Sequence, residues 1–202
     1  DRGATPSGRR RGAPPYRSSG ACAGARGPGA VVVRVEPCYL HSPGYCLMLK
    51  PTESAVIVAV PEAEPVVGTL RADLDRAAGW GVPAHVTVLY PFLPPDRIDD
   101  RALTALAAAI RTVPAFDLVL PRTAWFDDSV LWLAPEPDQP FRALTAAVWA
   151  RFPDYPPYGG GHADVIPHLT VGHDAPAAVL RPRIATGQHP RPRAARVRPA
   201  RP

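Results

Sequence analysis

The sequence predicts an α+β fold made of two similar lobes, and an internal duplication is the main reason. Residues 54–65 read SAVIVAVPEAEP and residues 129–140 read SVLWLAPEPDQP, so that a serine opens and a proline closes each stretch at an offset of 75. Each stretch is an apolar run that ends in a turn of prolines and acidic residues. A helical pattern follows each one. Two copies of one strand-and-helix unit predict two related lobes.

The predicted helices follow these strands. Residues 66–78 carry apolar residues at three- and four-residue spacing, and residues 141–152 carry them at every fourth position. A proline lies directly before each segment, at Pro65 and Pro140, which suits the first turn of a helix. A third helix is expected over residues 99–113, with Asp99 at its start and Pro114 as its stop.

The remaining strands complete the two lobes. Residues 115–126 alternate apolar and polar positions, and Asp127-Asp128 forms a turn into the second copy, which predicts a hairpin. A further strand ends each unit, at residues 85–90 and 168–171. Strand and helix alternation alone also allows a parallel α/β sheet. The duplication and the hairpin favour the two-lobed α+β arrangement.

The charges divide the chain into a body and two ends. Residues 53–180 carry 8 Arg, no Lys and 16 Asp or Glu, a formal charge of −8, whereas the whole chain is at +5. Residues 1–52 and 181–202 hold the basic excess. We expect the body to be the folded domain, and residues 1–52 to be a disordered or non-native extension. Residues 181–202 are expected to be a disordered Arg/Pro-rich tail, because such segments bury too little apolar surface to offset chain entropy.

Composition also limits the class of protein. No apolar run approaches the ~20 residues that a membrane-spanning helix needs. The three cysteines are an odd number and lie near the start of the chain, so a disulfide scaffold is not expected. No apolar segment follows the first arginines as it would in a signal peptide. We therefore expect a cytoplasmic monomer without a membrane contact.

The two lobes share one polar motif, an apolar strand interrupted by His-x-Thr. It occurs as His85 and Thr87 in the first copy, and as His168 and Thr170 in the second. Residues two apart in a strand project from the same face, so each histidine lies beside its threonine while the residues between them face the core. A single motif of this kind carries little information. Two of them at matching places of a duplication indicate a shared site.

This set of side chains suits phosphodiester chemistry without a metal ion. Imidazole titrates near neutral pH, so one histidine can accept a proton while the other donates one. Threonine hydroxyls can donate hydrogen bonds to phosphate oxygens. We therefore expect His85 and His168 to be catalytic and Thr87 and Thr170 to bind phosphate. Which histidine is the acid and which is the base stays open.

The motifs PAHVTVLYPF (residues 83–92) and VIPHLTVGH (residues 165–173) resemble those of the two-histidine (2H) phosphoesterase superfamily, and more narrowly the 2′-5′ RNA ligase family. The resemblance covers residues 53–180. It implies a bilobal fold with the four motif residues in a central cleft. It also implies action on RNA 2′,3′-cyclic phosphates or 2′-5′ linkages, with no cofactor; some members also join RNA ends in the reverse direction.

The chain departs from the family at both ends. The first fifty residues have no counterpart in the family. A helix and two strands that follow the second motif in the family are missing, so the second lobe is expected to be truncated. The substrate expected from the resemblance is an RNA end or a small nucleotide. One alternative is a non-catalytic protein that binds RNA through its arginine-rich ends, and another is an inactive, truncated family member.

Two further sets of residues are weaker candidates. Tyr90 and Phe92 follow the first motif and are candidates for stacking on a base, although burial in the lobe is an equal expectation. His162, His168 and His173 do not match a standard zinc spacing, so no metal site is expected.

Overall fold

The described strands of the protein lie in one antiparallel sheet. The computed structural model describes residues 30–35, 52–162, 164–173 and 195–197. The strands run in the spatial order β1-β2-β3-β6-β5-β4-β7. Their bounds are β1 (Ala30–Val35), β2 (Glu53–Ala59), β3 (His85–Leu89), β4 (Phe116–Phe126), β5 (Val130–Glu136), β6 (Leu169–Gly172) and β7 (Ala195–Val197). Every pair of neighbouring strands in this part of the chain is antiparallel, which excludes a parallel α/β sheet.

The predicted duplication is visible in the strand order. Strands β1-β2-β3 and strands β4-β5-β6 are two halves that run outward from a shared centre, where β3 lies beside β6. The hairpin between β4 and β5 is confirmed, with Phe126 opposite Val130. The two halves therefore form one continuous sheet.

The helices begin and end near the predicted positions. Their bounds are α1 (Glu64–Leu74), α2 (Arg76–Gly79), α3 (Asp100–Ile110) and α4 (Gln139–Arg151), with short 3₁₀ turns at Pro61–Ala63 (η1), Pro95–Arg97 (η2) and Pro157–Gly160 (η3). Asp99 caps α3 by accepting a hydrogen bond of 2.7 Å from the N–H of Ala102.

The prediction of one helix over residues 66–78 is wrong at Asp75. Asp75 has an extended backbone, which separates α1 from α2. Its carboxylate accepts the N–H of Ala77 at 3.0 Å and caps α2, and it also pairs with Arg71 of α1. A side chain that serves two partners at the helix end accounts for the break that apolar spacing did not reveal.

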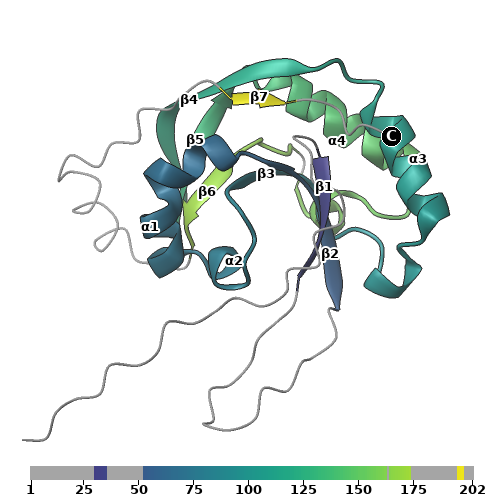
Figure 1. The fold of residues 1–202 in the computed structure, drawn as a ribbon, viewed down its shortest axis with the longest axis horizontal. Coiled ribbons are helices and arrows are strands. Elements are labelled where there is room, and N and C mark those ends of the chain that lie inside the picture. The colour runs from purple at the N-terminus through teal and green to yellow at the C-terminus, as the bar shows by residue number, and fades with distance from the viewer. Residues whose placement is uncertain (1–29, 36–51, 163, 174–194, 198–202) are drawn as a thin grey trace, which may run out of the picture.

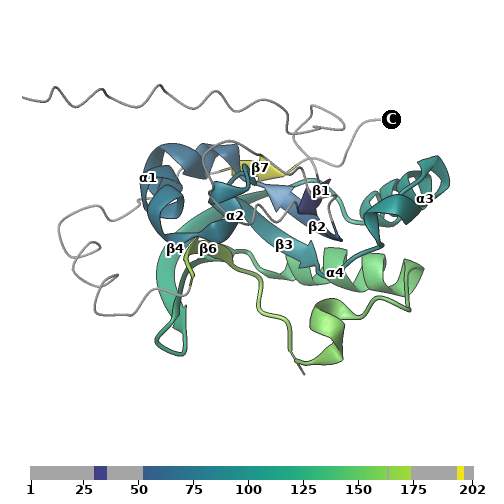
Figure 2. The same cartoon turned by 90° about the horizontal axis from the view of Figure 1, so that it is seen from below.

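One hydrophobic core serves both halves. It joins Val86 of β3 and Leu169 of β6, both fully buried, to apolar residues of α1, α3 and α4. Each long helix that follows a duplicated strand packs on the last strand of the other half, α1 on β6 and α4 on β3. In Figures 1 and 2, α1 and the α3–α4 pair lie at opposite ends of the sheet.

Hydrogen bonds also join α4 to β3 and α1 to the residue after β6, and so connect the two halves. Thr145 Oγ1 of α4 donates to the carbonyl of Val88 in β3 at 2.8 Å. The N–H of His173, after β6, donates to the carbonyl of Leu74 in α1 at 2.7 Å. The two lobes expected from the sequence are thus halves of one interlocked body with a common core.

Two short strands lie in the terminal segments for which the sequence predicts no structure. β1 lies within residues 1–52 and pairs with β2, and β7 lies within residues 181–202 and pairs with β4. The other residues of these segments are outside the described residues, as is the helix start expected at residues 175–180. The domain boundaries stay a prediction.

Candidate active site

The two His-x-Thr motifs lie on the face of the sheet opposite α1, α3 and α4. Val86 and Leu169 are fully buried in the core, whereas the four polar side chains that flank them are half-buried: His85, Thr87, His168 and Thr170. Because side chains alternate along a strand, all four project from the face that the core does not occupy.

The pairing of β3 with β6 brings the two motifs together. Val86 lies opposite Leu169, and this is the Cα pair that joins the two halves of the described sheet. One residue to either side, the antiparallel register sets His85 opposite Thr170 and Thr87 opposite His168. Directly opposed residues have Cβ atoms about 4.5–5.5 Å apart. Each histidine therefore faces the threonine of the other half.

The outer strands extend the same symmetry. Ile57 of β2 lies opposite Thr87, and Trp132 of β5 lies opposite Thr170. Ile57 and Trp132 are at the duplication offset of 75. Matching positions in the sequence therefore occupy matching positions in the sheet, which places both motifs in equivalent settings.

Each imidazole is held through its Nδ1 atom. His85 Nδ1 lies 2.7 Å from the carbonyl oxygen of Pro83, and His168 Nδ1 lies 2.7 Å from that of Ile166. A carbonyl oxygen only accepts, so Nδ1 must carry the proton in both rings. Nε2 is consequently the atom that gains or loses a proton, and each ring is oriented for that exchange.

Burial lowers the pKa of both histidines. For His85, desolvation is the largest effect; the bond to Pro83 raises the pKa, and nearby Arg71 lowers it while Asp75 raises it. For His168, desolvation is again largest, the bond to Ile166 raises the pKa, and His173 lowers it. His168 also lowers the pKa of His85, which is consistent with two imidazoles at one site.

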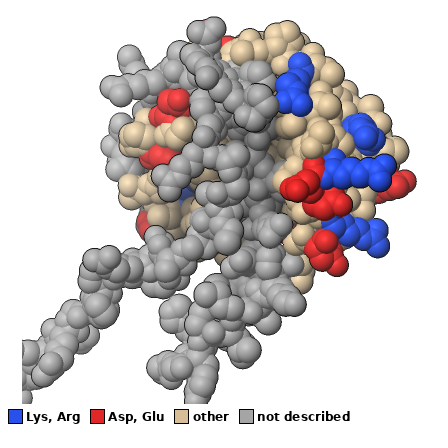
Figure 3. Space-filling view, turned by 45° about the vertical axis from the view of Figure 1, so that its right-hand side comes forward, with Lys and Arg blue, Asp and Glu red and all other residues tan. Residues whose placement is uncertain are grey.

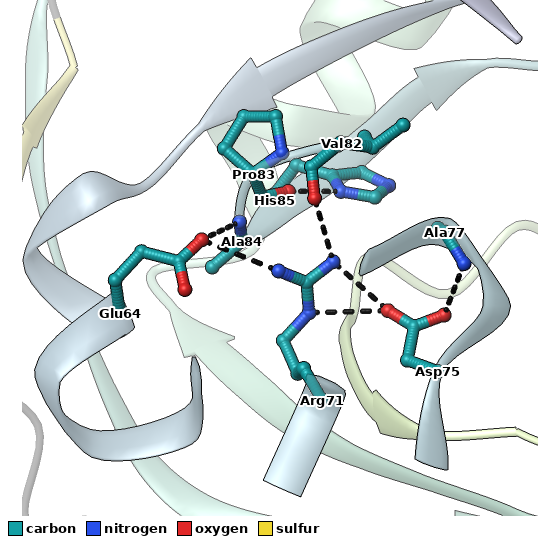
Figure 4. A network of polar contacts seen from close by, with 8 residues as sticks. All are labelled: Glu64, Arg71, Asp75, Ala77, Val82, Pro83, Ala84 and His85. Atoms are coloured by element: carbon teal, nitrogen blue, oxygen red, sulfur yellow. Dashed lines mark hydrogen bonds and ion pairs between the residues drawn. The ribbon is translucent and has the colours of Figure 1, made fainter. Parts of the chain in front are cut away.

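Arginines of α1 and α4 hold the segments that lead into the histidines. Arg71, of which 1% is exposed, donates to the carbonyl of Val82 at 3.2 Å, and Figure 4 shows this network beside His85. Arg142 donates to the carbonyl of Val165 at 3.2 Å. Both carbonyls lie three residues before a histidine. The two arginines occupy different positions in their helices but bind equivalent atoms.

The surroundings of the two histidines differ in aromatic content. The ring of Phe126 lies edge-on to that of His168, with centroids 4.8 Å apart, and stacks on Trp132 at the same distance. The ring of Trp132 lies 5.9 Å from that of His168. Its Nε1–H is buried without a hydrogen-bond partner among the described residues. Aromatic side chains thus border the site on the second half, where the first half has Ile57.

Tyr90 and Phe92, the two candidates for base stacking, are separated by the fold. Tyr90 lies on the motif face, packed against Ala55, Ile57 and Val82, and its hydroxyl donates to Glu53 at 2.6 Å. This bond and burial raise the pKa of Tyr90 to about 12. Phe92 is 4% exposed and lies in the core, edge-on to Phe152. The stacking prediction is wrong for Phe92, because it packs inside the body.

The remaining sequence expectations concern metals and membranes. Across the described residues, no three His, Cys, Asp or Glu side chains gather in an arrangement that could hold a metal ion. His162 lies against the ring of Tyr158, with centroids 5.4 Å apart. No helix in the described part of the chain combines the length and apolar character required to cross a membrane.

Sequence reasoning did not identify the residues that support the histidines. Arg71, Arg142, Phe126 and Trp132 are in this group. The duplication contained a signal for Trp132, since the offset of 75 aligns it with Ile57. A charge at Arg71 among the apolar positions of a helix was a second signal, because a buried arginine needs partners.

A family model described as the 2′-5′ RNA ligase superfamily matches residues 59–198. The match contains both motifs and continues past residue 180. No curated protein sequence gives a significant match.

Two solved structures are similar to this chain. One is the crystal structure of E. coli LigT complexed with 3′-AMP, at 20% identity and a TM-score of 0.41, covering 59% of this chain and 71% of that chain. The other is a crystal structure described as a phosphoesterase, at 22% identity and a TM-score of 0.38, covering 59% of this chain and 70% of that chain.

Proposed function

Because the chain belongs to the 2′-5′ RNA ligase superfamily, we propose that it is a phosphodiesterase that uses His85 and His168 as a general acid and base. The bonds cleaved are those of RNA 2′,3′-cyclic phosphates or 2′-5′ linkages, and no metal ion takes part. Thr87 and Thr170 bind the phosphate. The same groups can act in the reverse direction, in which RNA ends are joined.

The proposed hydrolysis needs two proton transfers at one phosphorus. A neutral histidine takes a proton from a water molecule as its oxygen attacks phosphorus, and a protonated histidine gives a proton to the leaving ribose oxygen. One cyclic diester and one water thus become one phosphate monoester. The threonine hydroxyls donate to the non-bridging oxygens, where negative charge develops in the transition state.

The orientation of the two imidazoles is the observation that carries this proposal. Both donate from Nδ1 to a carbonyl two residues earlier, at 2.7 Å, and both lie beside the strand pair that joins the halves. This leaves two Nε2 atoms as the titrating groups of one polar face. With a phosphate between two such atoms, the leaving oxygen gains a proton on one side and the attacking water loses one on the other.

The charge of the body favours a short substrate. Residues 53–180 have a formal charge of −8, and on the face in Figure 3 acidic side chains lie among the basic ones. A long RNA would meet repulsion from such a surface. An RNA end or a single nucleotide presents fewer phosphates, with its base near Tyr90 as a stacking partner.

The test is turnover of a 2′,3′-cyclic nucleotide by the full chain and its variants. His85→Ala and His168→Ala should each reduce turnover by ~10²-fold or more, the size of a general acid–base contribution. His162→Ala is the matched control, because His162 is exposed and is no part of the proposed pair. Its turnover should stay near that of the unaltered chain.

Circular dichroism of each variant must show an intact fold. Turnover that persists in either His85→Ala or His168→Ala would rule out the two-histidine mechanism. RNA binding that survives both substitutions and weakens steeply with salt would instead support the arginine-rich ends as a binding module.

A further inference from the structure

The two histidines differ in one peptide group. In each half, Nδ1 donates to the carbonyl oxygen of the residue two positions earlier, Pro83 or Ile166. That carbonyl belongs to the peptide group that joins this residue to the next. The nitrogen of that peptide belongs to Ala84 in the first half and to Pro167 in the second. Ala84 has an N–H group, whereas Pro167 has none. Only the first peptide can therefore donate a hydrogen bond while it accepts one from a histidine.

The N–H of Ala84 donates a hydrogen bond to a carboxylate. It donates to Glu64 Oε1, at the start of α1, as Figure 4 shows. Gly68, one turn later, leaves room for the carboxylate, since a Cβ there would lie 3.0 Å from Glu64 Oε2. Glu64, the Pro83–Ala84 peptide and the His85 ring thus form one chain of hydrogen bonds.

Hydrogen bonds in such a chain strengthen one another. An N–H that donates to an anion polarises its peptide, so the carbonyl at the other end becomes a better acceptor. A better acceptor at Nδ1 favours the charged form of the imidazole. The second half lacks this contribution, because Pro167 interrupts the chain.

We propose that Glu64 is a positioning residue, coupled to His85 through the Pro83–Ala84 peptide, that keeps the proton on His85 rather than on His168. Under the proposed function, on which this step rests, His85 is then the proton donor to the leaving oxygen and His168 accepts the proton of the attacking water. The asymmetry resides in one peptide nitrogen of an otherwise matched pair of segments.

Other charged groups face the two rings. Arg71 and His168 lower the pKa of His85, whereas Asp75 raises it. Arg71 pairs with Asp75 at 2.9 Å and with Glu64 at 3.3 Å, so its positive charge is balanced within the network. The charged neighbour that acts on His168 is His173, which opposes its protonation. Arg71 has a larger effect on the pKa of His85 than Asp75 has, so a proton on His85 depends on the added effect of the Glu64 carboxylate through the peptide.

The test is titration of the histidine rings by NMR, with His85 and His168 assigned through their alanine variants. Glu64→Gln keeps an acceptor oxygen for Ala84 and removes the charge. It should lower the pKa of His85 by roughly 0.5 pH units, the effect of a charge one peptide group away in a water-like dielectric. The pKa of His168 should not fall, because a proton held less strongly on His85 repels one on His168 less. Glu62→Gln is the matched control, because Glu62 is exposed in the preceding turn.

A second variant separates coupling through the peptide from charge acting through space. Ala84→Pro removes the N–H but keeps Glu64 and the carbonyl of Ala84, which accepts from Val60 at 2.7 Å. It should lower the pKa of His85 in the same direction as Glu64→Gln. Pro167 shows that this place in the motif accommodates proline.

The outcomes are distinct. An unmoved His85 in either variant, or an equal shift in Glu62→Gln, overturns the coupling. A chain that shows the shift but never turns over a cyclic nucleotide retains the coupling and loses the proposed function. In an active chain, the high-pH limb of kcat/KM should also shift to lower pH in Glu64→Gln.

Discussion

Arg71→Met should destabilise the protein more than any surface substitution. Arg71 is 1% exposed and Asp75 is 7% exposed. The guanidinium donates to Asp75 Oδ2 from Nε at 3.1 Å and from Nη2 at 2.9 Å. Methionine fills similar space without charge, so the substitution leaves the Asp75 carboxylate buried without its cation.

The magnitude follows from that unpaired charge. Removal of one partner of a buried ion pair costs about 3–5 kcal/mol. The Glu64 side chain is 38% exposed, so its pairing with Arg71 adds little. A loss of this size is a large part of the ~5–15 kcal/mol by which a typical domain is stable.

Urea denaturation of the full chain measures the loss, provided that the slope m is unchanged. The companion variant Arg71→Met/Asp75→Asn removes the stranded charge and keeps an oxygen to cap α2 at Ala77. It should recover about 2 kcal/mol or more. A loss of unfolding free energy below ~1 kcal/mol in the single variant, or no recovery in the double variant, would refute the conclusion that Arg71 and Asp75 form a stabilising buried ion pair.

Three further outcomes are expected. Burial lowers the pKa of both histidines from 6.5, and the active form needs one proton on the pair, so kcat/KM should peak below about pH 6.5; a plateau that extends above pH 8 would contradict this. A strong chelator should leave turnover of a cyclic nucleotide unchanged, and a large loss would support a metal site instead. Phe92→Ala should lower the free energy of unfolding by about 3–5 kcal/mol, measured by urea denaturation, because the ring is in the core; a loss of substrate affinity at unchanged stability would restore its role at a base.

Much of the local structure could be predicted from the sequence because it depends on nearby residues. Asp99 caps α3 as expected, and the turn at Asp127 joins β4 to β5, with Asp127 at a φ of 47°. The alternation of His85 and Thr87 with buried valines was also predicted from the two-residue period of a strand alone. The exception was Asp75, where a side-chain interaction with Arg71 decided the helix boundary.

The arrangement of the halves could not be predicted in this way. Packing of α1 on β6 and of α4 on β3 joins segments far apart in the chain, and no local pattern encodes which of two similar strands a helix will cover. The burial of Phe92 and the position of Tyr90 on the motif face follow from that packing. The contact of Phe126 with His168 has the same origin.

The sequence by itself determined the duplicated unit, the pairing of each histidine with a threonine and the face on which they lie, because these properties repeat with the period of a strand or the offset of the copies. Only the tertiary structure decided that the copies share one sheet and one core, that His85 lies opposite Thr170, and that Glu64 reaches the peptide before His85. These depend on strand register and on long-range packing, in which the free energy of burying a face is shared among segments that no short stretch of sequence contains.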